Sequence, residues 1–156
     1  MKEKVQVYVD SSAINGKVGA AAVLLREGKP LHALHLHLGP ESEHTVHEAE
    51  LVGILLGLQL IYTEKKAATS CMIGVDNQAA LRAFQADPRS PGQHIAREAT
   101  LTAKRIQTRR RGTKYTLTLR WTAGHEGVEG NKLVDREAKT AANGTSSAKH
   151  LLPLYL

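Results

Sequence analysis

The N-terminal part of the chain alternates between apolar and polar positions in a way that predicts three β-strands. The segment VQVYV at 5–9 has valine at every second position, which is typical of a strand, and we place this strand at 4–10. A second apolar run covers 18–27, and in a third, at 31–38, leucines alternate with histidines. Short polar turns separate the runs, so we expect hairpins with one buried and one wet face.

Two histidines of the third run, His35 and His37, point to the same side of the predicted strand. Such a pair can hold a metal, but a third ligand does not lie nearby in the sequence. We therefore favour a polar face on an outer strand.

Apolar positions with helical spacing appear after this strand region. Thr45 and Glu48 have the spacing of a capping box, with Thr45 as the N-cap of a helix that reaches Tyr62. The remaining expected elements are a buried parallel strand at 71–75, a short helix at 78–85, a helix from Ser90 to Arg109, a strand at 115–120 and a helix at 131–142 that ends at Asn143-Gly144.

This order predicts a single α/β domain. Three hairpin-linked strands followed by strand–helix crossovers make a mixed five-stranded sheet flanked by helices. We place the domain at 1–143, and the tail at 144–156 has too little pattern to assign a structure.

Composition narrows the class of protein. The chain has 156 residues, a formal net charge of +6 and 42% hydrophobic residues, which suits a globular domain with a basic surface that attracts polyanions. The N-terminal segment reads as a strand rather than a signal peptide, and no stretch has the length of about 20 apolar residues that spans a membrane. The single Cys71 excludes an internal disulfide. We expect an intracellular location, in the nucleus or cytoplasm, and no membrane partner.

Four acids recur at positions where α/β sheets place their sites. Asp10 and Asp76 end two strands, whereas Glu50 and Asp135 lie in the first turns of two helices that must pack on the sheet. Neighbouring carboxylates raise one another's pKa unless a cation lies between them. Oxygen ligands suit Mg²⁺ or Mn²⁺, so the sequence predicts a divalent metal site. Taken one at a time, each acid also fits a turn or a helix N-terminus.

Four segments carry a resemblance to a known family. YVDSSAINGKVGAAAVLL, HEAELVGILLGLQL, IGVDNQAALRAF and WTAGHEGVEGNKLVDREAK occur in the order found in type 1 ribonucleases H. The chain is most similar to the ribonuclease H domains of reverse transcriptases from non-LTR retrotransposons, over 4–142. The resemblance implies a ribonuclease H-like fold, and it implies cleavage of the RNA strand of RNA–DNA hybrids.

The resemblance also implies roles for individual residues. Asp10 would bridge two Mg²⁺ ions, for which Mn²⁺ can substitute, and Asp135 would share the ion that activates water. Glu50 and Asp76 would hold the ion that faces the leaving 3′ oxygen. His125, in the glycine-rich loop before Asp135, would assist proton transfer or product release. An exposed loop histidine is the plainer alternative for His125.

Two positions depart from the family pattern. Ser11 stands where glycine usually follows the first aspartate, and Val46 replaces a polar residue that reads the RNA 2′-hydroxyl. Thr45 matches the family's phosphate-pocket threonine. We therefore expect the RNA–DNA hybrid to be bound by a set drawn from several segments, namely Ser12, Asn15, Thr45, Asn77, Arg105, Arg109, Arg110 and Arg111. For the arginines, a solvated helix end is an equal alternative.

The preferred function is that of a metal-dependent ribonuclease H, derived from a retroelement and either free or part of a larger reverse transcriptase polyprotein. The main alternative is a nucleic-acid-binding module that keeps the fold but has little activity. An integrase or resolvase of the same fold class is a third reading. The histidine loop before Asp135 favours ribonuclease H over these last families.

Overall fold

The computed structural model describes residues 5–64, 70–76, 93–109, 116–121 and 128–153. Five strands form one sheet in the order β3-β2-β1-β4-β5. The first three strands pair antiparallel, whereas β1–β4 and β4–β5 pair in parallel. The strands are β1 (Val5–Ile14), β2 (Lys17–Arg26), β3 (Lys29–Pro40), β4 (Ser70–Val75) and β5 (Thr116–Trp121). The mixed five-stranded sheet is the one predicted from the sequence.

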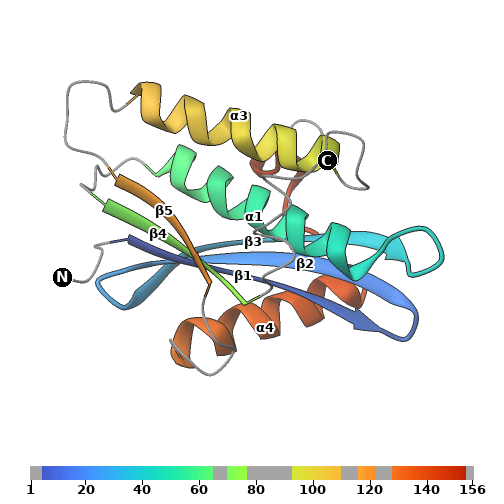
Figure 1. Cartoon of the computed structure of the whole chain (residues 1–156). Helices are drawn as coiled ribbons and strands as arrows, with labels where there is room; N and C mark the ends of the chain where they lie inside the picture. The colour runs from blue at the N-terminus through green and yellow to red at the C-terminus, as the bar shows by residue number, and fades with distance from the viewer. Residues whose placement is uncertain (1–4, 65–69, 77–92, 110–115, 122–127, 154–156) are drawn as a thin grey trace.

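Helices cover both faces of the sheet (Figure 1). On one face lie α1 (Val46–Thr63) and α3 (Gln93–Arg109), and on the other lies α4 (Val128–Ala142). Because side chains alternate along β1, the strand contributes to the core on both faces of the sheet: its valines pack toward α1, and Tyr8 packs with Val134 and Ala138 of α4. Burial of apolar side chains in both layers is the main favourable term for this arrangement.

Helix α1 is more deeply buried than the single apolar face in its sequence suggested. Every residue from Ala49 to Leu58 is buried, because the sheet packs on one side and α3 on the other. Thr45 caps it as predicted, since its hydroxyl accepts from the backbone N–H of Glu48 at 3.0 Å. By length and hydropathy α1 could cross a membrane, but 67% of this window is buried inside the protein, as in a core helix.

Strand β1 runs further than predicted. The expected strand ended at Asp10, whereas β1 continues to Ile14 and pairs with β2 along its whole length. The turn is therefore only Asn15 and Gly16, both with positive φ (51° and 75°). Two consecutive residues with positive φ define the tight hairpin turn that suits strand twist, so the segment after Asp10 is strand rather than loop.

Helix α4 begins at Val128, three residues before the predicted start at Asn131. Gly130 lies in its first turn, and a Cβ there would meet the Tyr8 ring at 2.3 to 2.9 Å. Glycine thus allows the start of α4 to pack directly on β1. The helix ends as predicted at Asn143-Gly144, where Gly144 has φ 116° and donates to the carbonyl of Ala141.

The C-terminal segment, unplaced by the sequence, follows the outer edge of β3. Ser146 and Ser147 accept from the backbone N–H groups of His37 and His35, both at 2.9 Å. These contacts cover hydrogen-bonding groups that an edge strand otherwise exposes. Beyond a short 3₁₀ turn, η2 (Lys149–Leu151), Leu152 joins the core.

The predicted wet face of β3 is instead partly covered by α4. The His35 ring lies 3.0 Å from Glu137, and the His37 ring contacts the carbonyl of Ala141 at 2.8 Å. Both histidines therefore connect β3 to α4.

Candidate active site

Asp10 and Asp76 meet where two parallel strands diverge. The pairing of β1 with β4 runs from Val5 to Tyr8, and beyond this point β1 pairs only with β2, which it contacts along its whole length. Asp10 follows two residues later, and Asp76 directly follows the end of β4. The two carboxylates thus lie just beyond the end of the parallel pairing between β1 and β4, at the carboxyl edge where α/β sheets usually place ligand sites, although β1 itself continues to Ile14.

Glu50 reaches the same place from α1. The helix packs closely on β1, since a Cβ on Gly53 would lie 3.4 Å from the Asp10 carbonyl oxygen and one on Gly57 would lie 3.0 Å from Val7. These glycines are three and seven residues after Glu50, so they share its side of the helix. Close packing leaves the Glu50 side chain only 4% exposed.

The carboxylates of Asp10, Glu50 and Asp76 offer oxygens that lie within 4.8 Å of one another. Burial, reinforced by the neighbouring acids, raises the pKa of Asp10 to about 6 and that of Glu50 to about 7. Partial burial raises the pKa of Asp76 as well. Like charges this close disfavour one another, so the cluster is unfavourable at neutral pH without added positive charge.

One oxygen in the cluster lacks a partner within the described part of the chain. Glu50 Oε1 accepts a hydrogen bond from the Ser11 hydroxyl at 2.5 Å, whereas the buried Oε2 has none. A buried carboxylate oxygen without a donor is costly. Together with the all-oxygen donor set, it fits a hard divalent cation such as Mg²⁺.

Asp135 lies near this group but not within it. It is the eighth residue of α4, so it lies in the third turn rather than in the first turns as predicted. Its carboxylate forms an ion pair with Lys139 at 2.8 Å, and its charge contributes to the raised pKa of Asp10. Asp135 therefore faces the Asp10 side of the cluster, across the sheet from Glu50.

The structure describes only some of the residues predicted to bind the hybrid. Ser12 is half-buried in β1, Asn15 is exposed at the hairpin turn, and Thr45 is exposed as the N-cap of α1. The structure leaves their binding roles as predictions. The predicted residues Asn77, Arg110, Arg111 and His125 lie outside the described part of the chain.

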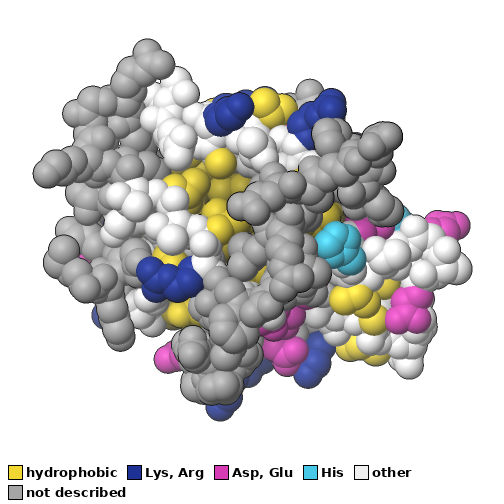
Figure 2. All heavy atoms as spheres, in the orientation of Figure 1, with side chains coloured by type: hydrophobic (Ala, Val, Ile, Leu, Met, Phe, Trp, Pro, Cys, Tyr) yellow, Lys and Arg dark blue, Asp and Glu magenta, His cyan; other side chains and the backbone are white. Residues whose placement is uncertain are grey.

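Arg109 has a structural role that the sequence did not reveal. Its guanidinium lies 4.9 Å from the centre of the Tyr62 ring and donates to the Tyr62 carbonyl oxygen. It thus supplies a hydrogen-bond donor to one of the carbonyl groups that the helix itself leaves unpaired at the end of α1. On the face shown in Figure 2, Lys and Arg side chains lie over α3 at the top and are also scattered lower down.

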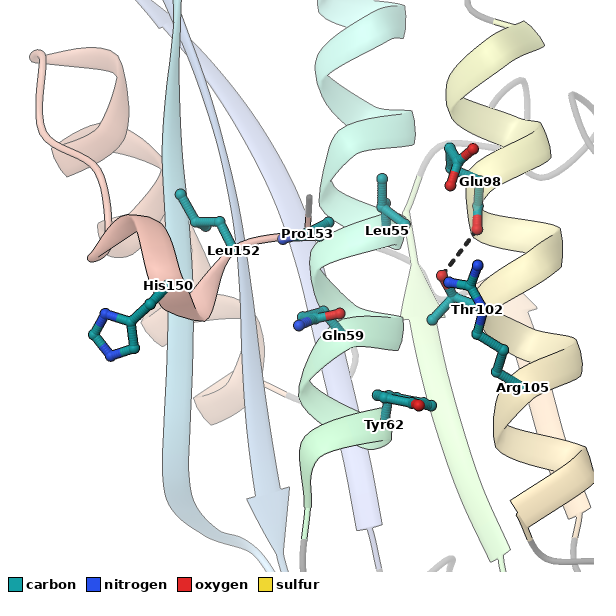
Figure 3. A pocket seen from close by; sticks show the side chains of 9 residues that line it. All are labelled: Leu55, Gln59, Tyr62, Glu98, Thr102, Arg105, His150, Leu152 and Pro153. Carbon is teal, nitrogen blue, oxygen red and sulfur yellow. Dashed lines mark hydrogen bonds between the residues drawn. The ribbon is translucent and has the colours of Figure 1, made fainter. Parts of the chain in front are cut away.

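Arg105 lines a cavity of about 350 Å³ between α1, α3 and the C-terminal segment. In Figure 3 its side chain extends along α3 toward Thr102, and Leu152 and Pro153 lie on the opposite side of the cavity. The lining includes none of the clustered acids, so the cavity is separate from the candidate active site.

Sequence reasoning missed two polar neighbours of the acids, Ser11 and Lys139. The signal for Ser11 was the period of two in β1, which directs it to the opposite face from Asp10 and toward α1. The signal for Lys139 was its spacing of four residues from Asp135 on one helix.

Comparison with known proteins agrees with this geometry. The RNase H family profile matches residues 2–143, and comparison with the curated proteins gave no match. The fold is similar to the N-terminal RNase H domain of Rv2228c from Mycobacterium tuberculosis, with TM-score 0.67 and 16% identity over 91% of this chain and 98% of that one. LC11-RNase H1, solved with an RNA/DNA hybrid, gives TM-score 0.61 and 17% identity over 88% and 99%.

A reverse transcriptase also has this fold. The prototype foamy virus protease–reverse transcriptase gives TM-score 0.69 and 15% identity, covering 93% of this chain and 21% of that one. Identities this low establish the fold alone, whereas the family profile spans nearly the whole sequence. On that match, the chain belongs to the RNase H family.

Proposed function

We propose that the protein hydrolyses the RNA strand of RNA–DNA hybrids, with two divalent metal ions held by Asp10, Glu50, Asp76 and Asp135. The observation that carries this proposal is the cluster of three acids whose oxygens lie within 4.8 Å, with the unpartnered Glu50 Oε2 among them. When bound, two such ions supply positive charge to the attacking and leaving oxygens of a phosphodiester.

The residues around the metal site have separate proposed roles. Asp10 belongs to the cluster with Glu50 and Asp76, and the charge of Asp135 on α4 also contributes to its raised pKa, which suits a ligand shared by both ions. Ser12 and Asn15 follow Asp10 in β1 and its turn, and Thr45 caps the helix that carries Glu50. We assign these three residues to the hybrid backbone and the RNA 2′-hydroxyl.

His125 belongs to the proposal on sequence grounds alone. We assign it a proton-transfer or product-release role, because it precedes Asp135 in the family's motif order. The change His125→Ala should slow cleavage by about 10²-fold or more without abolishing it, since acid–base groups contribute about 10² to 10⁴. A loss as complete as that of an acid variant would show that this role of His125 is misassigned.

The substrate class also draws on a relative. LC11-RNase H1 was solved in complex with an RNA/DNA hybrid, and the basic charge of this chain suits a polyanion. The foamy virus match supports an origin in a reverse transcriptase, and we extend this to a retrotransposon and to an intracellular location. Whether the chain acts alone or within a polyprotein changes neither the site nor its test.

The deciding experiment compares substrates of one sequence. End-labelled RNA–DNA hybrid, double-stranded RNA and double-stranded DNA are incubated with the protein in Mg²⁺, in Mn²⁺ and in excess chelator. We expect cleavage of the RNA strand of the hybrid only, with both metals and not in chelator. Asp76→Asn should remove cleavage, and Glu43→Gln, which removes an exposed acid outside the cluster, should not. Hybrid binding without cleavage would instead support a non-catalytic binding module.

A further inference from the structure

Ser11 connects two of the candidate metal ligands. Because side chains alternate along β1, Asp10 points with Tyr8 toward α4, while Ser11 points with Val9 toward α1. The Ser11 backbone N–H donates to Asp10 Oδ1 at 2.8 Å, and its hydroxyl donates to Glu50 Oε1 at 2.5 Å. One residue thus fixes a carboxylate on each side of the sheet.

The hydroxyl determines which oxygen of Glu50 remains available. Oε1 is occupied by Ser11, and Oε2 is buried without a partner in the described residues. We propose that Ser11 is a positioning residue that restricts Glu50 to binding metal through one oxygen, and thereby makes the site selective for Mg²⁺ over Ca²⁺. This inference rests on the metal site of the proposed function.

The packing of α1 supports such a restriction. Gly57 brings the helix backbone so close to β1 that a Cβ there would lie 3.0 Å from Val7 and 3.1 Å from Val9, and a Cβ on Gly53 would be in ordinary contact with β1 at 3.4 Å. The backbone of Glu50 is therefore held in place by the contact between helix and strand. Its carboxylate can change orientation only through side-chain torsions, and the bond from Ser11 restrains those torsions.

The two ions differ in the ligands they need. Mg²⁺ prefers six oxygens in an octahedron and keeps several waters, so one oxygen from each carboxylate is enough. Ca²⁺ takes six to eight oxygens at longer distances and often binds both oxygens of a carboxylate. To bind Ca²⁺ in this way, Glu50 must release the hydrogen bond from Ser11. A hydrogen bond to a charged group corresponds to roughly tenfold or more in an equilibrium constant.

The test measures Mg²⁺ and Ca²⁺ dissociation constants by calorimetric titration of the protein without nucleic acid. We expect Ser11→Ala to lower the ratio of the Ca²⁺ constant to the Mg²⁺ constant by about tenfold. Ser11→Thr keeps the hydroxyl and favours a strand, so it should keep the wild-type ratio. Ser42→Ala, at an exposed turn position, is the matched control. Far-UV circular dichroism confirms folding at the titration temperature.

Infrared spectra of the Ca²⁺-loaded proteins give a second readout, because the separation of the two carboxylate stretching bands is smaller when both oxygens bind one ion. Ser11→Ala should gain a population with the smaller separation. If the wild type prefers Mg²⁺ and Ser11→Ala has the same ratio within twofold and the same spectrum, the role of Ser11 is wrong while the metal site stands. If the wild type binds neither ion, the metal site of the proposed function fails, and this inference fails with it.

Discussion

Replacing Asp10 by Asn should stabilise the metal-free protein while it removes activity. Burial and the neighbouring acids raise the pKa of Asp10 from 3.8 to about 6. A pKa difference of about 2 units corresponds to about 3 kcal/mol at 1.36 kcal/mol per unit. This is the free energy of unfolding that the wild type loses when Asp10 is fully ionised. The amide keeps the acceptor for the Ser11 N–H but still loses contact with water, so we expect a gain of about 1 to 2 kcal/mol.

The gain should depend on pH in a defined direction. Because the pKa is raised by folding, the wild type has its full stability below about pH 4 and loses it as the pH rises toward 6. Asp10→Asn should therefore unfold about 3 to 6 °C above the wild type at pH 8, and the difference should shrink toward pH 4. Glu50, with a pKa of about 7, adds a similar loss of wild-type stability up to neutral pH.

The assay is thermal unfolding of both proteins from pH 4 to pH 8, in chelator and in Mg²⁺. Bound metal stabilises the folded state according to its concentration over its dissociation constant, so Mg²⁺ should raise the melting temperature of the wild type and leave Asp10→Asn nearly unchanged. Glu43→Gln removes an exposed charge and is the control. A variant that is less stable than the wild type at pH 8 in chelator would refute the argument that the Asp10 charge is unfavourable in the fold.

Three further predictions follow from other contacts. Gly19→Ala should lower the free energy of unfolding by about 3 kcal/mol or more, because its Cβ would lie 2.3 Å from the α4 backbone. Gly53→Ala, with nearest atoms at 3.4 Å, should have little effect, and chemical denaturation measures both variants. Arg109→Ala should lower the free energy of unfolding by about 1 kcal/mol, because the contacts with the end of α1 are lost. If the denaturation curve is unchanged and hybrid binding depends less steeply on salt, Arg109 instead contacts phosphate. Lys139→Met should tighten Mg²⁺ binding by calorimetry, because Asp135 loses its ion-pair partner; unchanged or weaker binding would show that the pair does not compete with metal.

The sequence predicted the sheet because its strands carry strong local signals. Alternation in the first three strands and the apolar run before Asp76 depend on burial, which the one-dimensional pattern records directly. The end of β1 was misjudged because Ser11 to Ile14 contains few apolar residues. The Asn15-Gly16 pair was the available signal, since it specifies a two-residue hairpin turn and therefore paired strands up to it.

The start of α4 could not be read in the same way. A glycine-rich sequence ordinarily indicates a loop, and Gly130 was therefore assigned to the loop before the helix. Its actual role is steric, because the helix lies on the Tyr8 ring and has no room for a side chain. Such a contact joins residues far apart in the sequence, and no local pattern records it. The same limit applies to Arg109, whose partner Tyr62 is on another helix.

The acids show what each kind of reasoning can reach. The expectation that two parallel neighbours carry Asp10 and Asp76 brought these acids together correctly, although β1 runs on past Asp10. The distinction between Glu50 and Asp135 required the structure: one approaches from the α1 face and is buried beside Ser11, while the other lies half-exposed on the α4 face beside Lys139. The two faces therefore present the shared Asp10 with unequal environments. If these acids bind metal as proposed, a buried ligand held by a hydroxyl favours selective binding of one ion, whereas a half-exposed ligand paired with an exposed lysine favours exchange. On this basis, the ion on the Glu50 side should bind first and the ion on the Asp135 side should bind more weakly.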